Sequence, residues 1–295
     1  MKMPVLSDIL PIVREAGEII LRREGADRIA AKAAQDFVTD VDFRVQCFIR
    51  DRLAKDWPEI QFMGEEQDNS GLDFTKPYWV LDPIDGTTNF IHDFKASVIS
   101  LALVCDHDPI FGVVYNPSTG EEFTGIRGVG AYLNGAPIAV GSASSLREAL
   151  VFVGTAPYRR KEMDENFRRI QRVYLSSHDI RRFGCTALEL CYIACGRADG
   201  QFEFGTKPWD IAAGWLILRE AGGEVVSGWG GSPPLDGESA IVSTNGKFTE
   251  ELRALMSFGT TARVAPTRKE KVKARTLVRA FFVCTCIIPA KCGAA

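Results

Sequence analysis

Histidine is scarce in this chain of 295 residues: it occurs only three times, and the eight cysteines form no CxxC pair. A zinc module or another metal centre built on histidine is therefore not expected. The sequence also lacks the run of about eighteen apolar residues that a membrane span needs. Its start lacks the apolar core of a signal peptide, so we expect a cytoplasmic protein with free thiols. The net charge of −3 argues against a nucleic-acid partner.

The most informative stretch is the apolar run Tyr78–Leu81, which predicts a buried strand and is followed by Asp82 and Asp85. Open α/β sheets bind their ligands at such strand ends. Gly86 and two hydroxyl residues come next, and they offer the N–H and O–H donors that an oxyanion needs. Carboxylates beside an anion would repel it unless cations lay between them. The stretch therefore predicts a divalent-metal site that binds a phosphate ester.

Two other acidic positions follow predicted ends of strands or helices. Glu65 comes after a short apolar stretch, and Asp210 opens a helix expected over residues 208–221. Taken alone, each of these carboxylates would be interpreted as a solvent-exposed charge on a loop. Together with Asp82 and Asp85 they supply the hard oxygen ligands that Mg²⁺ prefers, and a few shared carboxylates suffice for two ions.

Apolar spacing predicts helices over residues 5–24 and 40–55, and Thr39 with Asp42 resembles a capping box at the start of the second. We expect residues 1–143 to form an N-terminal α+β domain that carries the main metal site. Residues 144–258, where strands and helices alternate, are expected to form a C-terminal α/β domain that completes the site. The basic tail, residues 259–295, is expected to be disordered or an artificial extension.

Two long motifs resemble signatures of the inositol monophosphatase family. The members of this family are Mg²⁺-dependent, Li⁺-sensitive phosphatases. The segment Trp79–Phe90 resembles the first signature, and the segment Trp209–Gly214 resembles the second. The short segments Gly64–Glu66 and Val38–Asp42 match further family positions in the right order. The resemblance covers residues 5–256, and it implies an α+β fold built as a layered α/β/α/β/α sandwich.

The resemblance also implies which residues bind metal. Glu65, Asp82 and the backbone carbonyl of Ile84 would hold one Mg²⁺ ion, and Asp82, Asp85 and Asp210 would hold a second. Glu65 would also lie near a third, weaker ion. The ligands match position by position, so two or three ions per site are expected.

The remaining site residues implied by the resemblance act on water and substrate. Thr87, with Glu65 or Asp42, would orient the water that attacks phosphorus. The resemblance implies substrate contacts that bind the phosphate, lie beside the metal ions or face the leaving alcohol. They are Ile84, Asp85, Gly86, Thr87, Gly184, Cys185, Thr186, Glu203 and Asp210. A covalent route through Cys185 or Thr87 is disfavoured, because no histidine stands obviously beside either.

The expected reaction is hydrolysis of a phosphate monoester by activated water, with myo-inositol 1-phosphate as the expected substrate and a homodimer as the expected assembly. Cys185 and Thr186 stand where many relatives have serine or threonine followed by a small residue, so the substrate stays open. Fructose 1,6-bisphosphate, 3′-phosphoadenosine 5′-phosphate and NADP(H) are the alternatives within the same superfamily. An alternative of another class is a regulatory protein that keeps the fold and binds the transcription machinery.

Overall fold

The computed structural model describes residues 3–33 and 36–256. These residues belong to one compact unit, Met1–Thr260, which contains two large β-sheets and a small two-stranded sheet. The predicted tail, residues 259–295, lies outside the described residues, and the predicted boundary after residue 143 stays a prediction. None of the described helices is long and apolar enough to cross a bilayer.

The first sheet has seven strands in the order β3-β4-β5-β6-β7-β8-β9. Only the β3–β4 pair is parallel, and every other neighbouring pair in this sheet is antiparallel. The strands are β3 (Gln61–Gly64), β4 (Tyr78–Asp85), β5 (Val98–Cys105), β6 (Asp108–Asn116), β7 (Glu121–Ile126), β8 (Gly130–Leu133) and β9 (Ala136–Pro137).

The second sheet has five strands in the order β11-β10-β12-β14-β13. β10 is parallel to both of its neighbours, whereas β14 is antiparallel to both of its own. The strands are β10 (Leu150–Val153), β11 (Asp179–Arg181), β12 (Gly200–Thr206), β13 (Glu224–Ser227) and β14 (Ser239–Thr244).

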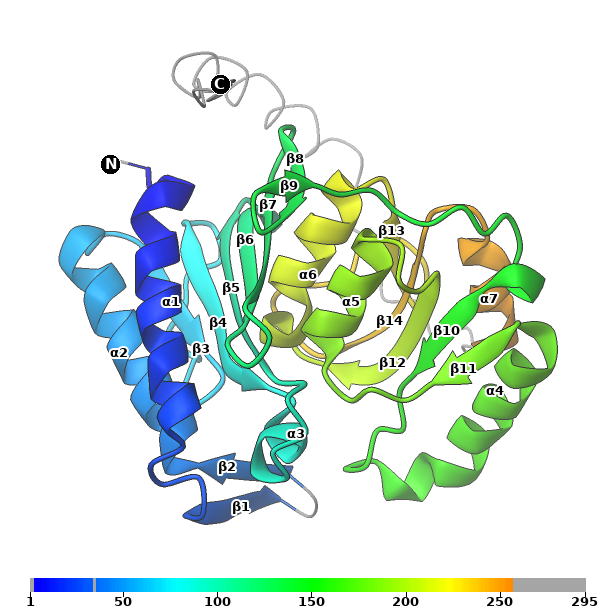
Figure 1. Ribbon diagram of the computed structural model, residues 1–295, viewed down its shortest axis with the longest axis horizontal. Helices are drawn as coiled ribbons and strands as arrows, with labels where there is room; N and C mark the ends of the chain where they lie inside the picture. Colours follow the sequence, from blue (N-terminus) through cyan, green and yellow to red (C-terminus); the bar gives the residue numbers. More distant parts are fainter. Residues whose placement is uncertain (1–2, 34–35, 257–295) are drawn as a thin grey trace, which may run out of the picture. The chain divides into compact units, whose positions relative to one another are not determined.

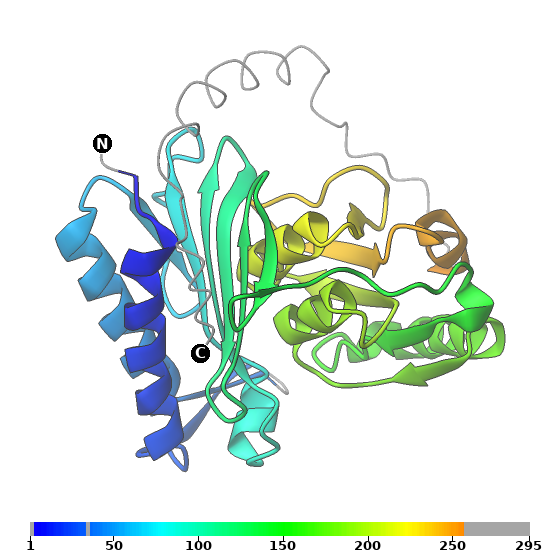
Figure 2. The same cartoon turned by 45° about the horizontal axis from the view of Figure 1, so that its top comes forward.

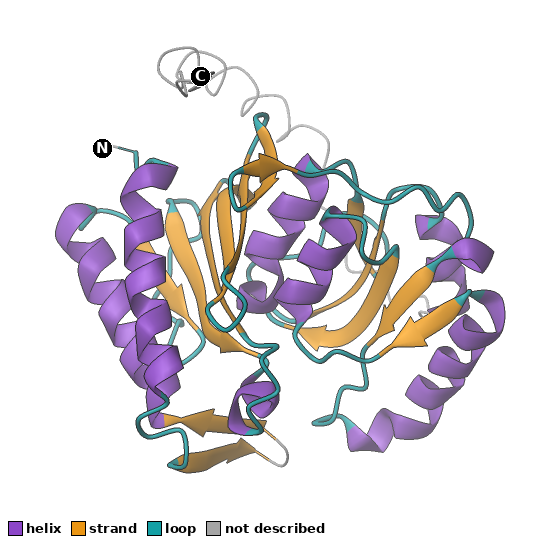
Figure 3. Cartoon of the chain, viewed as in Figure 1, coloured by secondary structure: helices purple, strands orange, loops and turns teal. Residues whose placement is uncertain are grey.

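Helices cover both faces of each sheet (Figures 1 and 3). α1 (Leu6–Arg22) and α2 (Asp40–Asp56) pack on one face of the seven-stranded sheet. α5 (Thr186–Ala194) and α6 (Pro208–Glu220) lie between the two sheets, and the turned view in Figure 2 shows the same order of layers. α4 (Met163–Ser176) and α7 (Thr249–Met256) cover the outer face of the five-stranded sheet. The predicted α/β/α/β/α sandwich is confirmed.

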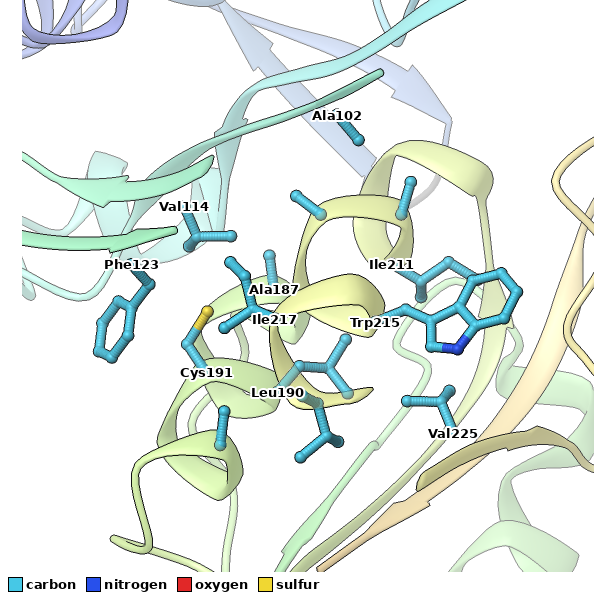
Figure 4. Packing of buried hydrophobic residues seen from close by; sticks show 14 of the residues in the cluster. Ala102, Val114, Phe123, Ala187, Leu190, Cys191, Ile211, Trp215, Ile217 and Val225 are labelled. Atoms are coloured by element: carbon cyan, nitrogen blue, oxygen red, sulfur yellow. The ribbon is translucent and has the colours of Figure 1, made fainter. Parts of the chain in front are cut away.

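The central helix layer is apolar on all sides, as expected for helices buried between two sheets. Ile211 through Leu218 on α6 are all buried. Figure 4 shows side chains of α5 and α6 packed against residues of the seven-stranded sheet such as Val114 and Phe123. Gly112 and Gly125 let this sheet approach α6 closely, since a Cβ at either position would come within about 3.1 Å of the α6 backbone.

The helices and the strand predicted from apolar spacing are present, whereas several short elements were not predicted. The helices predicted over residues 5–24 and 40–55 are α1 and α2, and the predicted capping box of Thr39 and Asp42 is present. The sequence did not predict the hairpin of β1 (Ile29–Ala33) and β2 (Asp36–Thr39), the helix α3 (Thr87–Ile91), α7, or the short 3₁₀ turns Leu146–Glu148 and Arg160–Glu162. Elements of three to eight residues span too few turns to produce a clear apolar period.

Candidate active site

Asp82 and Asp85 lie at the end of β4, where the register of the seven-stranded sheet shifts. Asp82 pairs with Ser100 and Asp85 pairs with Val98, so the residues between them form an irregularity in the ladder. The two carboxylates are 3% and 8% exposed. The irregularity places both side chains at the same strand end, within the protein interior.

Four of the predicted metal-binding carboxylates come together here. Burial raises the pKa of Asp82 well above its usual range, and the like charges of its neighbours raise it further. The neighbours that act in this way are Glu65, Asp85 and Asp210. Glu65 follows β3, where its N–H donates to the Leu81 carbonyl, and Asp210 lies in the first turn of α6. Three separate elements therefore deliver carboxylates to one place.

The N-terminus of α5 holds Asp85. The N–H of Ala187 donates to Asp85 Oδ2 over 2.6 Å, and the Cys185 thiol donates to the same oxygen over 3.3 Å. Burial raises the pKa of Asp85 to about 6, and these two donors oppose the rise. The Cys185 side chain is 1% exposed and faces Asp85, and the substrate contact predicted at this position stays a prediction.

A sharp turn links Asp85 to α3 and supplies the predicted phosphate donors. Gly86 has a φ of +85° and precedes α3, whose first residue is Thr87. The Thr87 hydroxyl donates to the Ile84 carbonyl over 3.1 Å. Left-handed backbone at this position favours glycine, which explains why the acidic pair is followed by Gly86.

Asn89 joins this turn to the second half of the chain, a role that the sequence analysis did not assign. Its Nδ2 donates to the carbonyls of Ala96, Phe183 and Gly184 over 2.8, 3.0 and 3.3 Å. Phe183 and Gly184 come directly before α5, which holds Asp85. Asn89 lies within the first signature, but the sequence does not reveal this role, because the partners before α5 lie more than ninety residues away.

Asp42 is buried and serves the cap of α2. Its Oδ2 accepts from the N–H and the hydroxyl of Thr39 over 2.8 and 2.6 Å. One turn further along α2, the Gln46 side-chain oxygen accepts from the N–H of Glu66 over 2.9 Å. This face of α2 therefore contacts the segment that contains Glu65. The water-orienting role of Asp42 stays a prediction.

Glu203 marks the side of the site that the sequence assigned to the leaving alcohol. It lies on β12 against Gly154, where a Cβ would clash with the Glu203 carboxylate. Burial and the charge of Glu189 raise the pKa of Glu203 well above its usual range, and the nearby guanidinium of Arg182 lowers it. Arg182 also donates from Nε to the Thr155 hydroxyl over 3.3 Å. The sequence analysis assigned no role to Arg182 or Glu189.

This set of oxygen donors fits a hard divalent cation. Burial and the neighbouring negative charges disfavour the charged forms of Asp82, Asp85 and Asp210, and a bound cation would offset both effects. Within residues 3–33 and 36–256, no three acidic, histidine or cysteine side chains form a group that could hold a metal ion as it stands. Mg²⁺ does not require three such side chains, because it keeps several waters and uses few protein ligands.

Comparison with known proteins identifies the family. The model of the inositol monophosphatase family matches residues 3–260. The chain belongs to this family. It is 42% identical to inositol monophosphatase 3 of Solanum lycopersicum, an alignment that covers 72% of this chain and 81% of the relative. It is 37% identical to the Nus factor SuhB of Vibrio cholerae, with 82% and 91% covered. The solved inositol monophosphatase of Anabaena (Nostoc) has a TM-score of 0.76 and 29% identity, with 85% and 94% covered.

Membership in the inositol monophosphatase family confirms the fold and the reaction class that the sequence predicted. The activity is hydrolysis of an inositol phosphate ester, and a phosphorylated cyclitol or sugar fits as substrate. The structure brings Glu65, Asp82, Asp85 and Asp210 together. The exact role of each residue belongs to the proposal below.

Proposed function

We propose that this chain hydrolyses myo-inositol 1-phosphate to myo-inositol and phosphate, with Mg²⁺ bound at the end of β4. The observation that carries the proposal is the meeting of Glu65, Asp85 and Asp210 at the buried Asp82 carboxylate. The carboxylates lie next to a Gly-Thr turn whose N–H donors suit an anion. Their negative charge would repel that anion unless cations lay between them.

The proposed ligands divide into two overlapping sets. Glu65, Asp82 and the Ile84 carbonyl would hold one ion, and Asp82, Asp85 and Asp210 a second; Glu65 would also serve a third, weaker site. Bound Mg²⁺ would neutralise phosphate charge and favour deprotonation of a water. Asp82 belongs to both main sets, and its burial between the other carboxylates supports this assignment.

Thr87 and Glu65 are the proposed groups that handle the attacking water. The Thr87 hydroxyl donates its hydrogen bond to the Ile84 carbonyl, so its oxygen can accept a hydrogen bond from water. The Glu65 carboxylate, or that of Asp42, would accept the second hydrogen bond and orient the water for in-line attack. The N–H groups of Gly86 and Thr87 would bind the phosphate oxygens.

The leaving alcohol would lie between the 184–186 turn, defined as Gly184–Thr186, and Glu203. The Glu203 carboxylate would accept a hydrogen bond from a ring hydroxyl. Asp85 and Asp210 would contact the ester side of the substrate through the same carboxylates that hold metal. Glu203 packs directly against Gly154, where a side chain would displace its carboxylate.

A panel of phosphate esters tests the substrate. Initial rates at fixed Mg²⁺ are compared for myo-inositol 1-phosphate, fructose 1,6-bisphosphate, 3′-phosphoadenosine 5′-phosphate and NADP. We expect the highest kcat/KM with myo-inositol 1-phosphate. A higher value with any other ester would move the chain to that alternative within the superfamily.

Lithium should inhibit turnover at millimolar concentration. The family resemblance carries this expectation, and phosphate release at increasing LiCl measures it. Sodium chloride at equal ionic strength is the control, because it separates a site-specific effect from screening of surface charges. Equal rates in both salts would place the chain in a lithium-insensitive branch.

Replacing Glu203 by alanine should raise KM for myo-inositol 1-phosphate about tenfold or more and change kcat less. The physical reason is the loss of one charge-assisted hydrogen bond to a hydroxyl of the alcohol, which contributes about 1.5–3 kcal/mol. Glu224→Ala, an exposed change in the same sheet, is the matched control and should leave both constants unchanged. A fall in kcat at constant KM would show that Glu203 does not bind the leaving alcohol.

A second function is favoured by the relatives named Nus factor SuhB. The chain would then bind a component of the transcription machinery in addition to its catalysis. Size-exclusion chromatography of the purified chain with RNA polymerase tests this, and failure to co-elute would argue against it. A homodimer and a cytoplasmic location also stay predictions, and light scattering of the isolated chain decides the first.

A further inference from the structure

Glu189 is a buried carboxylate that lies outside the two sequence signatures and has no role in the proposed chemistry. It lies on α5 and is 1% exposed. Its Oε1 accepts from the N–H groups of Gly184 and Phe183 over 2.8 and 3.2 Å. Its Oε2 accepts from Gln201 Nε2, on β12, over 2.6 Å. Burial raises the pKa of Glu189 to about 7, which these backbone donors oppose.

The two backbone groups that Glu189 holds belong to the segment that leads into α5 and supports Asp85. Gly184 has a φ of +79°, and the next residues, Cys185 and Ala187, donate to the Asp85 carboxylate. On the opposite side, Asn89 donates to the carbonyls of the same two residues. The peptide groups at 183 and 184 are thus fixed by Glu189 through their N–H groups and by Asn89 through their oxygens.

All three groups that hydrogen-bond to Glu189 are donors, and a carboxylate can accept from all of them without offering a proton. Gln201 turns its amide nitrogen toward Glu189, although its own oxygen then has no hydrogen-bond partner within the described residues. Leaving a buried oxygen unpaired costs about 1–3 kcal/mol. The two backbone N–H groups already need an acceptor at this position, and the Gln201 amide adds a third donor.

We propose that Glu189 is a positioning residue that fixes the 184–186 turn and, through it, the Asp85 carboxylate. A continuous series of hydrogen bonds runs from Gln201 on the five-stranded sheet through Glu189 and the turn to Asp85 on the seven-stranded sheet. The effect on catalysis rests on the proposed function, since it assumes that Asp85 binds Mg²⁺. Without Glu189, the N–H groups of Phe183 and Gly184 would lose their acceptor. The groups that donate to Asp85 would then no longer be held in one position.

Three variants separate positioning from stability. Glu189→Ala removes both oxygens. Glu189→Gln keeps one oxygen for the two N–H groups, and its amide can donate to the free oxygen of Gln201 after that side chain turns over. Glu122→Ala is the matched control, because Glu122 is also buried, at 6% exposed, and accepts two hydrogen bonds from Arg14 far from the turn.

The decisive measurements are Mg²⁺ binding by titration calorimetry and hydrogen exchange of the peptide that contains residues 183–187. For Glu189→Ala we expect at least about tenfold weaker Mg²⁺ binding, faster exchange in this peptide and a raised KM. Glu189→Gln should recover most of the binding and protection. Glu122→Ala should lower the melting temperature while leaving Mg²⁺ binding and exchange of the turn unchanged.

Wild-type Mg²⁺ affinity and wild-type exchange in Glu189→Ala would overturn the proposal. If that variant does not fold, Glu189→Asp replaces it; the shorter side chain should weaken Mg²⁺ binding and loosen the turn, and unchanged values would again overturn the proposal. A wild-type chain that hydrolyses none of the tested esters would refute the proposed function alone, because exchange of the 183–187 peptide still reports on Glu189.

Discussion

Replacing Asp82 by asparagine should lower kcat/KM at least about a thousandfold, equivalent to about 4 kcal/mol of transition-state stabilisation. Asparagine has the same shape, and its oxygen can still accept from the N–H of Ile84, which now donates to Asp82 Oδ1 over 3.0 Å. The change therefore removes charge with little disturbance of the strand end. Because Asp82 is proposed to serve both ions, no other single carboxylate should have a larger effect.

A second expected property of Asp82→Asn concerns stability. The Asp82 carboxylate repels three neighbours when no cation is bound, so the metal-free variant should melt at the same temperature as the wild type or higher. The rise in melting temperature that Mg²⁺ causes in the wild type should disappear. Scanning calorimetry with EDTA and with Mg²⁺ measures both. Asp199→Asn, which alters an aspartate whose Oδ2 accepts from the Leu150 N–H, should keep the Mg²⁺ effect.

Replacing Gly86 by alanine should lower activity at least about a hundredfold and also destabilise the protein. A Cβ here would lie 3.0 Å from the Ala96 carbonyl oxygen, 3.2 Å from Cys185 Cβ and 3.3 Å from the Gly184 carbonyl oxygen. Two of these are backbone atoms that cannot move away alone. Relief of the clash must shift either the Asp85–Thr87 turn or the 184–186 turn, and a displacement of about 1 Å is enough for such a loss.

Gly120→Ala is the control for Gly86→Ala, because it isolates backbone strain from the clash. Gly120 has a φ of +71°, close to that of Gly86, but no atom lies within 4 Å of its added Cβ. We expect a loss of about 1 kcal/mol in the free energy of unfolding, and unchanged kcat and KM. Denaturant unfolding and steady-state kinetics of both variants measure the difference. Equal effects at both glycines would mean that strain alone explains position 86.

The buried acidic end of β4 could be predicted because its residues are close together in the sequence. Asp82 and Asp85 follow one apolar strand, and Gly86 follows them at once, so a single segment carries acid, turn and donors. The capping box at Thr39 was likewise predictable, since its two members are three residues apart. In both cases the physical cause of the structure lies within one turn or one strand.

The supporting contacts could not be predicted, because each joins residues that are distant in the chain. Ala187 donates to Asp85 across 102 positions, and Asn89 reaches Gly184 across 95. Glu189 is closer to its partners, yet a glutamate in an early helical turn usually suggests a solvated residue that favours the helix N-terminus. Its burial becomes visible only when the five-stranded sheet covers α5. The roles of Glu203 and of the alcohol pocket stay predictions for the same reason.

The helix layer between the two sheets has a consequence for how the protein can be divided. α5 and α6 belong to the second half of the chain, but α6 packs against β5, β6 and β7 of the first half. A chain cut after residue 143 would leave this apolar surface exposed on both fragments, so each fragment alone should aggregate. Mixed together during refolding, the fragments should recover a soluble complex. Because Asp85 comes from one fragment and its donor Ala187 from the other, phosphatase activity would then measure how well the two halves complement each other.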